Sequence, residues 1–183
     1  MMTKNSNTSS TTSTSNMNEV FLVDNVLSID ECDYCIDYFK INRNENNTQN
    51  WRNTTTMLLN LQDKKLKTIV EKITQFVHFN YNNEIKYDYG QIVMWPTGTN
   101  QFEHTDVPLP NKKDSVSLTS ISYLNDDFEG GQTFFEHNNN FVVPVKGTTV
   151  YFDGQKIVHG VNKITKNTRY TLPIWYKKNG TNN

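Results

Sequence analysis

The order of apolar and polar residues divides the chain into an N-terminal helical part and a C-terminal part of short strands. Residues 19–27, "EVFLVDNVL", predict a short apolar strand. The next segment opens with Ser28 and has Glu31 three residues later, the capping-box spacing that begins a helix. A second helix is predicted within residues 61–81, because apolar side chains recur there at helical spacing. These are Leu66, Ile69, Val70, Ile73, Phe76 and Val77.

The remaining segments predict a loop and then a series of strands. Residues 40–53 are rich in asparagine, which predicts a loop that Trp51 anchors to the core. From residue 85 onward, short alternating runs such as "SVSLTSISYLN", "GTTVYFDG" and "RYTLPIWYK" are separated by Gly, Pro, Asn and Asp. This texture is typical of a β-sandwich or barrel. We therefore expect a mainly β (α+β) fold, with two N-terminal helices supporting a sandwich whose interior holds a small ligand.

Length and charge restrict the choice of function. The chain has 183 residues, enough for one domain, and we expect a disordered Ser/Thr/Asn-rich tail at 1–18 followed by a folded domain at 19–183. Its net charge of -1 gives no electrostatic reason to expect a nucleic-acid partner. The sequence has no apolar run of the roughly 20 residues that span a bilayer, and its first residues lack the apolar core of a secretory signal. We therefore expect no membrane association and a cytoplasmic location.

Two cysteines, Cys32 and Cys35, lie on the first predicted helix with a spacing that places both thiols on one face. A redox pair or half of a zinc site would fit this spacing. No second cysteine pair follows, which favours two structural cysteines.

Three residues form a candidate metal site. In the extended segment "QFEHTDVPLP", His104 and Asp106 face the same side, and His159 follows a later predicted strand in "FDGQKIVHGVNK". If the sandwich brings His159 beside the other two, they form the 2-His-1-carboxylate arrangement of non-haem ferrous oxygenases. The alternative interpretation is a surface histidine, an aspartate in a turn and a loop histidine. The other histidines, His78 and His137, are expected at the surface and in a turn.

The last predicted strand adds a candidate anion site. Alternation in "RYTLPIWYK" places Arg169, Thr171 and Trp175 on one face and a conventional core set on the other. A buried arginine needs an anionic partner, and a small dicarboxylate would satisfy it because the guanidinium fork matches a carboxylate. The alternative is an exposed arginine in water.

The motifs together resemble one family. "QIVMWPTGTNQFEHTD", "SISYLNDDFEGGQTFFE", "VPVKGTTVYFDGQKIVHGV" and "NTRYTLPIWYKK" are similar to the catalytic domain of 2-oxoglutarate- and ferrous iron-dependent dioxygenases, most closely the prolyl 4-hydroxylase type. The resemblance implies a double-stranded β-helix (jelly roll). It also implies coupling of 2-oxoglutarate decarboxylation to C–H hydroxylation with O2 and Fe(II), helped by ascorbate.

The resemblance also implies roles for individual residues. His104, Asp106 and His159 would bind iron, and Arg169 would hold the far carboxylate of 2-oxoglutarate. Supporting positions around that cosubstrate would be Tyr123, Thr133, Thr171 and Trp175. Two departures stand out: Trp95 replaces a tyrosine common in prolyl hydroxylases, and Arg169 replaces the lysine of collagen-type members.

Peptidyl proline, in a peptide or protein partner, is the leading substrate implied by the resemblance. Another protein residue or a small molecule remains open within the same chemistry. From a different class, the chain could be a metal-binding jelly roll without turnover, or a sandwich used only for protein interaction. The sequence leaves the oligomeric state undetermined.

Overall fold

The computed structural model describes residues 20–81, 84–106, 115–135 and 140–178. The predicted tail at 1–18 lies outside the described residues, and so does His137. None of the helices in the described ranges combines the length and apolar character needed to cross a membrane.

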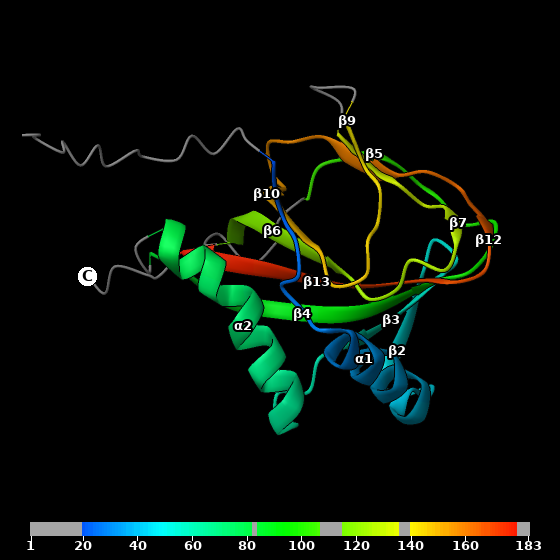
Figure 1. The fold of residues 1–183 in the computed structure, drawn as a ribbon, viewed down its shortest axis with the longest axis horizontal. Coiled ribbons are helices and arrows are strands. Elements are labelled where there is room, and N and C mark those ends of the chain that lie inside the picture. Colours follow the sequence, from blue (N-terminus) through cyan, green and yellow to red (C-terminus); the bar gives the residue numbers. More distant parts are fainter. Residues whose placement is uncertain (1–19, 82–83, 107–114, 136–139, 179–183) are drawn as a thin grey trace, which may run out of the picture.

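Two antiparallel sheets form a sandwich (Figure 1). The major sheet has the order β1-β10-β6-β13-β4-β3-β2. Its strands are β1 (Phe21–Val23), β2 (Thr48–Trp51), β3 (Thr54–Leu58), β4 (Ile85–Trp95), β6 (Ser115–Tyr123), β10 (Thr149–Asp153) and β13 (Arg169–Lys178). The minor sheet has the order β5-β11-β8-β9. Its strands are β5 (Gln101–His104), β8 (Thr133–Phe135), β9 (Asn140–Val142) and β11 (His159–Val161). A separate short pair consists of β7 (Glu129–Gly130) and β12 (Ile164–Lys166).

Both predicted helices are present and lie on the same side of the major sheet, away from the minor sheet (Figure 1). Helix α1 (Ile29–Asn42) begins with the predicted capping box, in which Ser28 and Glu31 each accept a backbone N–H of the other. Helix α2 (Lys64–Asn80) is capped by Asp63. The apolar faces of both helices pack with the outer face of the sheet in the largest hydrophobic core. The two helices therefore cover one face of the sheet and leave the other facing the minor sheet.

The prediction of a loop at residues 40–53 was wrong in part. Thr48–Trp51 and Thr54–Leu58 form a hairpin, β2–β3, and β3 pairs with β4 at the edge of the major sheet. The strands were missed because their residues are polar and lack apolar alternation, while edge pairing depends on backbone hydrogen bonds. Trp51 does not anchor the segment, since it is 47% exposed and Arg52 lies over its ring at 4.6 Å.

The two cysteines are structural, as the sequence favoured. Both Cys32 and Cys35 are fully buried in the core between α1 and the sheet, and they are not joined by a disulfide. Burial raises the pKa of Cys32 to about 11 and that of Cys35 to about 12. Both thiols are therefore protonated at neutral pH and poorly suited to redox or metal chemistry.

Candidate functional site

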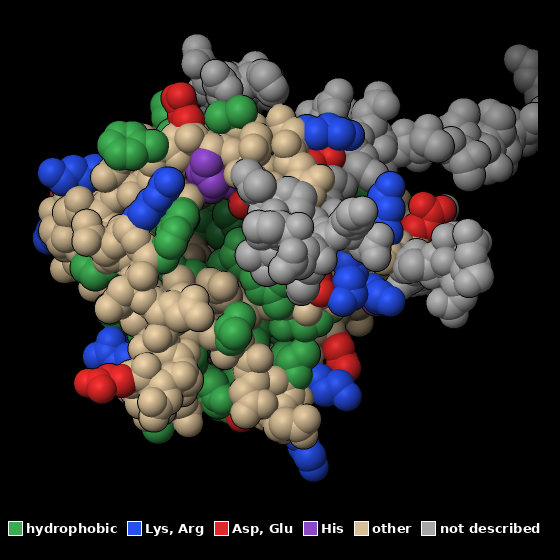
Figure 2. All heavy atoms as spheres, turned by 180° about the vertical axis from the view of Figure 1, so that it is seen from behind, with side chains coloured by type: hydrophobic (Ala, Val, Ile, Leu, Met, Phe, Trp, Pro, Cys, Tyr) green, Lys and Arg blue, Asp and Glu red, His purple; other side chains and the backbone are tan. Residues whose placement is uncertain are grey.

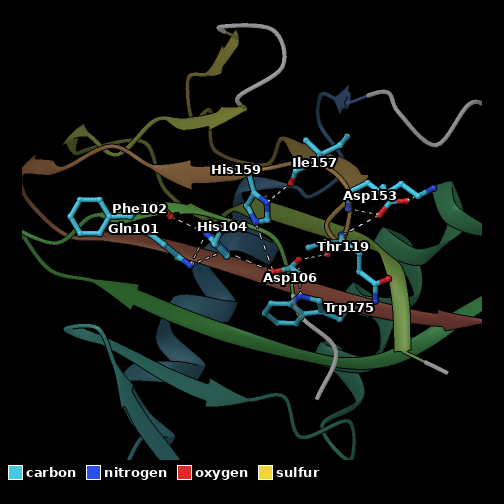
Figure 3. A network of polar contacts seen from close by, with 11 residues as sticks. Gln101, Phe102, His104, Asp106, Thr119, Asp153, Ile157, His159 and Trp175 are labelled. Carbon is cyan, nitrogen blue, oxygen red and sulfur yellow. Dashed lines mark hydrogen bonds and ion pairs between the residues drawn. The ribbon is translucent and has the colours of Figure 1, made fainter. Parts of the chain in front are cut away.

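The fold brings His104, Asp106 and His159 together between the two sheets (Figure 3). His159 and His104 are cross-strand partners on β11 and β5, and their ring centroids are 4.3 Å apart. Asp106 follows β5, where its backbone N–H donates to the Gly154 carbonyl at 2.7 Å. One side-chain donor atom from each residue lies within 4.8 Å of the others. One ion could therefore contact all three after small side-chain movements.

Both histidines are oriented as metal ligands. The Nδ1 atom of His104 lies 3.0 Å from the Phe102 carbonyl, and that of His159 lies 3.0 Å from the Ile157 carbonyl. Because a carbonyl only accepts, each Nδ1 carries the proton and each Nε2 has a lone pair. In His104 that lone pair accepts from the Gln101 amide N–H, which a bound metal would replace. Burial lowers the pKa of His159, and neighbouring His104 lowers it further, although Asp106 opposes the shift. A neutral imidazole is the form that binds a metal.

The two oxygens of Asp106 have different surroundings (Figure 3). Oδ1 lies 3.8 Å from His159 Nε2 and 4.0 Å from His104 Nε2. Oδ2 accepts a hydrogen bond from the Thr119 hydroxyl at 2.6 Å and another from the Trp175 indole N–H at 3.1 Å. The oxygen that faces the two histidines is therefore the one that the two protein donors do not use.

Gly154 permits this arrangement because it has no side chain. A Cβ atom at this position would lie 2.2 Å from Asp106 Oδ2 and 2.4 Å from Thr119 Oγ1. Both distances are far below van der Waals contact. The close approach of the backbone to the carboxylate requires glycine.

Arg169 supplies the second part of the site. Its side chain is buried, with 1% of the residue exposed, and its Nη2 donates to Thr133 Oγ1 at 3.2 Å. The guanidinium lies over the rings of Trp95 and Tyr123, at 5.1 Å and 5.5 Å. Tyr123 also donates its hydroxyl to Thr133 Oγ1 at 2.8 Å. The predicted supporting residues Tyr123 and Thr133 thus surround the arginine.

The arginine is short of partners within the described parts of the chain. No described carboxylate lies within ion-pair distance of its guanidinium, and its Nε has no hydrogen-bond partner there. Burial lowers the pKa of Arg169 to about 10, although Tyr123 partly offsets this. The group still carries its charge at neutral pH, and a buried cation of this kind fits an anionic carboxylate.

The other predicted residues have different contacts. Trp95 donates its indole N–H to Thr171 Oγ1 at 3.1 Å, so the Thr171 hydroxyl is already a hydrogen-bond acceptor for the tryptophan. Trp175 lies against Asp106 and stacks on Tyr89, with ring centroids 4.7 Å apart. Asp153, which is not among the predicted site residues, accepts the backbone N–H groups of Gln155 and Lys156 and so stabilises the turn after β10. His78 is exposed, as predicted.

The sequence did not point to three residues that lie around the candidate metal ligands. Gln101 is buried, and its amide nitrogen lies 2.8 Å from His104 Nε2. Thr119 and Tyr89 reach the site from β6 and β4. Their only signal in the sequence was a position on the inward face of a strand, which many other residues share.

Figure 2 shows histidine atoms at the edge of a surface hollow whose floor is hydrophobic.

Comparisons with known proteins identify solved structures that share this fold. Neither the protein-family models nor the curated protein sequences contain a match to the chain. Among solved structures, it is similar to a viral collagen prolyl hydroxylase from Paramecium bursaria Chlorella virus-1 in complex with 2-oxoglutarate. The TM-score is 0.72 at 18% identity, covering 87% of this chain and 96% of that one.

Two further structures give the same result. A prolyl-4-hydroxylase from Pseudomonas putida has a TM-score of 0.65 at 16% identity and covers 88% of this chain and 93% of its own. HygX from Streptomyces hygroscopicus, solved with nickel and 2-oxoglutarate bound, has a TM-score of 0.68 at 11% identity and covers 88% and 84%. The jelly-roll fold of 2-oxoglutarate oxygenases, expected from the sequence resemblance, is confirmed.

Proposed function

We propose that the protein is a 2-oxoglutarate- and Fe(II)-dependent oxygenase. His104, Asp106 and His159 would hold the metal through two imidazole nitrogens and one carboxylate oxygen, a set that leaves coordination positions open. Arg169 would bind the distal carboxylate of 2-oxoglutarate, with Thr133 and Tyr123 as its supporting hydroxyls. When bound, the metal and cosubstrate supply the oxidising power for hydroxylation of a C–H bond in the presence of O2.

The buried guanidinium of Arg169 is the observation that favours this function over a metal-binding jelly roll without turnover. A structural metal site gives no reason to bury a cation against two aromatic rings, with no partner for its Nε among the described residues. A dicarboxylate cosubstrate supplies the missing anion, because the planar guanidinium forms paired hydrogen bonds with a carboxylate.

The residues of this chain would contribute binding, orientation and exclusion of water. The carbonyls of Phe102 and Ile157 keep the two Nε2 atoms unprotonated and aimed inward. The Arg169 guanidinium is buried from water beside the rings of Trp95 and Tyr123, which strengthens its attraction for a carboxylate. Ascorbate would act only by restoring ferrous iron between turnovers.

A proline in a peptide or protein is the substrate that we propose first. The sequence motifs are closest to the prolyl 4-hydroxylase type. Two of the similar structures are prolyl hydroxylases, and another is a Trichoplax adhaerens prolyl hydroxylase in complex with a hypoxia inducible factor peptide. The solved structures with this fold also include SnoN, an alpha-ketoglutarate dependent epimerase from nogalamycin biosynthesis, so oxidation of a small molecule is the second candidate.

Succinate release tests the activity and the substrate together. The full chain, with Fe(II), 2-oxoglutarate and O2, is assayed with and without a proline-rich peptide, followed by mass analysis of the peptide. We expect peptide-stimulated succinate and a hydroxyl mass gain on proline, both lost in His159→Ala. If only small molecules, and not the peptide, stimulate succinate release, the substrate is a small molecule. If no succinate is released under any condition, the proposed oxygenase activity is refuted.

A further inference from the structure

Both hydrogen bonds on Asp106 Oδ2 come from a row of three residues that lie side by side across the major sheet: two of them donate, and the third stacks on one of the donors. Thr119 on β6, Trp175 on β13 and Tyr89 on β4 are direct cross-strand neighbours. Directly opposed residues point to the same face of a sheet, and here that face is the one toward the metal ligands. We refer to Thr119, Trp175 and Tyr89 as the carboxylate clamp.

Each member of the clamp has a distinct contact. Thr119 is 3% exposed and donates its hydroxyl to Oδ2 at 2.6 Å, a short bond of the charge-assisted kind. Trp175 donates its indole N–H to the same oxygen at 3.1 Å. Tyr89 stacks on the Trp175 indole at 4.7 Å with the two ring planes 13° apart. The tyrosine therefore fixes the plane in which the indole N–H points.

The clamp restricts how Asp106 can bind a metal. A carboxylate binds a cation through one oxygen or through both. To use both oxygens, Asp106 would have to turn Oδ2 away from the Thr119 and Trp175 donors, leaving a largely buried hydroxyl and an indole N–H without this acceptor. Breaking charge-assisted bonds at a partly buried site is unfavourable. Rotation is also restricted by the backbone of Gly154, which lies directly against Oδ2 and is itself hydrogen-bonded to Asp106.

We infer that the carboxylate clamp confines Asp106 to one-oxygen coordination and thereby preserves a metal position for the cosubstrate. Thr119, Trp175 and Tyr89 are positioning residues, because they act through Asp106 and not on the substrate. This inference rests on the proposed metal centre. Its consequence is specific: without the clamp the second carboxylate oxygen competes for a position that 2-oxoglutarate needs, while metal binding itself is retained.

Two substitutions remove one donor each, and the first of them hardly changes the shape of the side chain. Thr119→Val replaces the hydroxyl by a methyl group, and Trp175→Phe removes the N–H while keeping an aromatic ring against Tyr89. Thr119→Ser keeps the hydroxyl and serves as the matched control. Tyr89→Phe keeps the stack, whereas Tyr89→Leu removes it.

The experiment measures Fe(II) affinity and then 2-oxoglutarate affinity of the iron-loaded protein, both without oxygen. A Co(II)-loaded sample reports the coordination number by its absorption spectrum. In Thr119→Val and Trp175→Phe we expect 2-oxoglutarate affinity about tenfold weaker. Iron affinity should fall by clearly less than this, because the freed second carboxylate oxygen also binds the metal. The Co(II) spectrum should change toward higher coordination before cosubstrate is added. Thr119→Ser should match the parent. Tyr89→Phe, which keeps the stack, should lie closer to the parent than Tyr89→Leu, which should resemble Trp175→Phe.

Three results would overturn the inference, and they differ in what they leave standing. Unchanged 2-oxoglutarate affinity and an unchanged Co(II) spectrum in both donor-removing variants would refute the role of the clamp but leave the proposed metal centre intact. Iron affinity that falls in parallel with cosubstrate affinity would mean that the clamp only holds Asp106 in place. A parent protein that binds no metal would refute the metal centre and the inference with it.

Discussion

Arg169 and Trp95 are direct cross-strand neighbours on β13 and β4, and the Arg169 guanidinium lies 5.1 Å from the centre of the Trp95 ring. The indole N–H is directed to Thr171 and not to the arginine. Trp95 therefore offers the proposed cosubstrate region an aromatic face but no free hydrogen-bond donor, unlike the tyrosine that is common at this position in the family that the sequence resembles. The tryptophan stabilises the buried cation by its ring alone.

Arg169→Met is expected to separate binding from stability. The change removes the proposed carboxylate partner, so 2-oxoglutarate affinity should fall at least a hundredfold while Fe(II) affinity stays within a few-fold. The melting temperature without cosubstrate should not fall, because the arginine is a buried cation with no described anionic partner. Titration of cosubstrate and thermal melts measure the two effects. Arg43→Met, at an exposed arginine, is the control. Unchanged cosubstrate affinity would contradict the assignment.

Two threonine substitutions are expected to differ in their effect on cosubstrate binding. Thr133 is the hydrogen-bond partner of Arg169, so Thr133→Val should weaken 2-oxoglutarate binding. Thr171 accepts the buried Trp95 N–H, so Thr171→Val should cost about 1–3 kcal/mol of unfolding free energy with a smaller effect on the cosubstrate. Denaturant unfolding and cosubstrate titration of both variants test this. A larger loss of cosubstrate affinity in Thr171→Val than in Thr133→Val would reverse the two roles.

Gly154→Ala is expected to damage the metal site selectively. The new Cβ would meet Asp106 Oδ2 at 2.2 Å and displace the carboxylate, so Fe(II) affinity should fall at least tenfold. Gly98→Ala is the control, because Gly98 has open space around it but a φ of +94°. That substitution should cost about 1 kcal/mol of stability and leave iron affinity unchanged. Equal iron affinities in the two variants would count against the close packing at Asp106.

Glu31 gives a pH-dependent prediction for the first helix. Burial alone would raise its pKa, but Lys72 and Ser28 outweigh burial and hold the pKa below its usual value of 4.5. A carboxylate with a lowered pKa adds stability above its unfolded pKa and loses it as the pH falls through the folded value. Glu31→Gln should therefore cost about 1 kcal/mol at pH 7 and much less near pH 3. Urea unfolding at both pH values, with Glu45→Gln as an exposed control, measures this. A cost independent of pH would assign the effect to something other than the charge.

The parts of the fold that depend on local chemistry were predictable from the sequence. The capping box needs only Ser28 and Glu31 three residues apart, and the burial of α2 follows from its apolar spacing. The polar hairpin β2–β3 was not predictable, because backbone pairing with β4 leaves no periodic side-chain signal. Trp51 was assigned to the core on hydrophobicity alone, yet it lies exposed on this edge hairpin.

In the candidate site, too, residues close in sequence were predictable, and those that depend on strand pairing were not. His104 and Asp106 are close in sequence, so their joint use could be proposed, whereas the contribution of His159 depended on which strands become neighbours. The structure makes β11 the neighbour of β5 and brings the three together. Thr119 and Tyr89 could not be found in advance, because their role arises from the register across β6, β13 and β4, which the sequence does not state.

The most direct test of the central claim is an anaerobic titration of the full chain with Fe(II) and 2-oxoglutarate, followed by visible absorption. We expect the charge-transfer absorption of a 2-oxo acid chelated to ferrous iron only when both are present, with none in His159→Ala. Arg169→Met should still bind iron but need far more 2-oxoglutarate to develop the absorption. Absence of iron binding, or iron binding that 2-oxoglutarate does not perturb, would contradict the account.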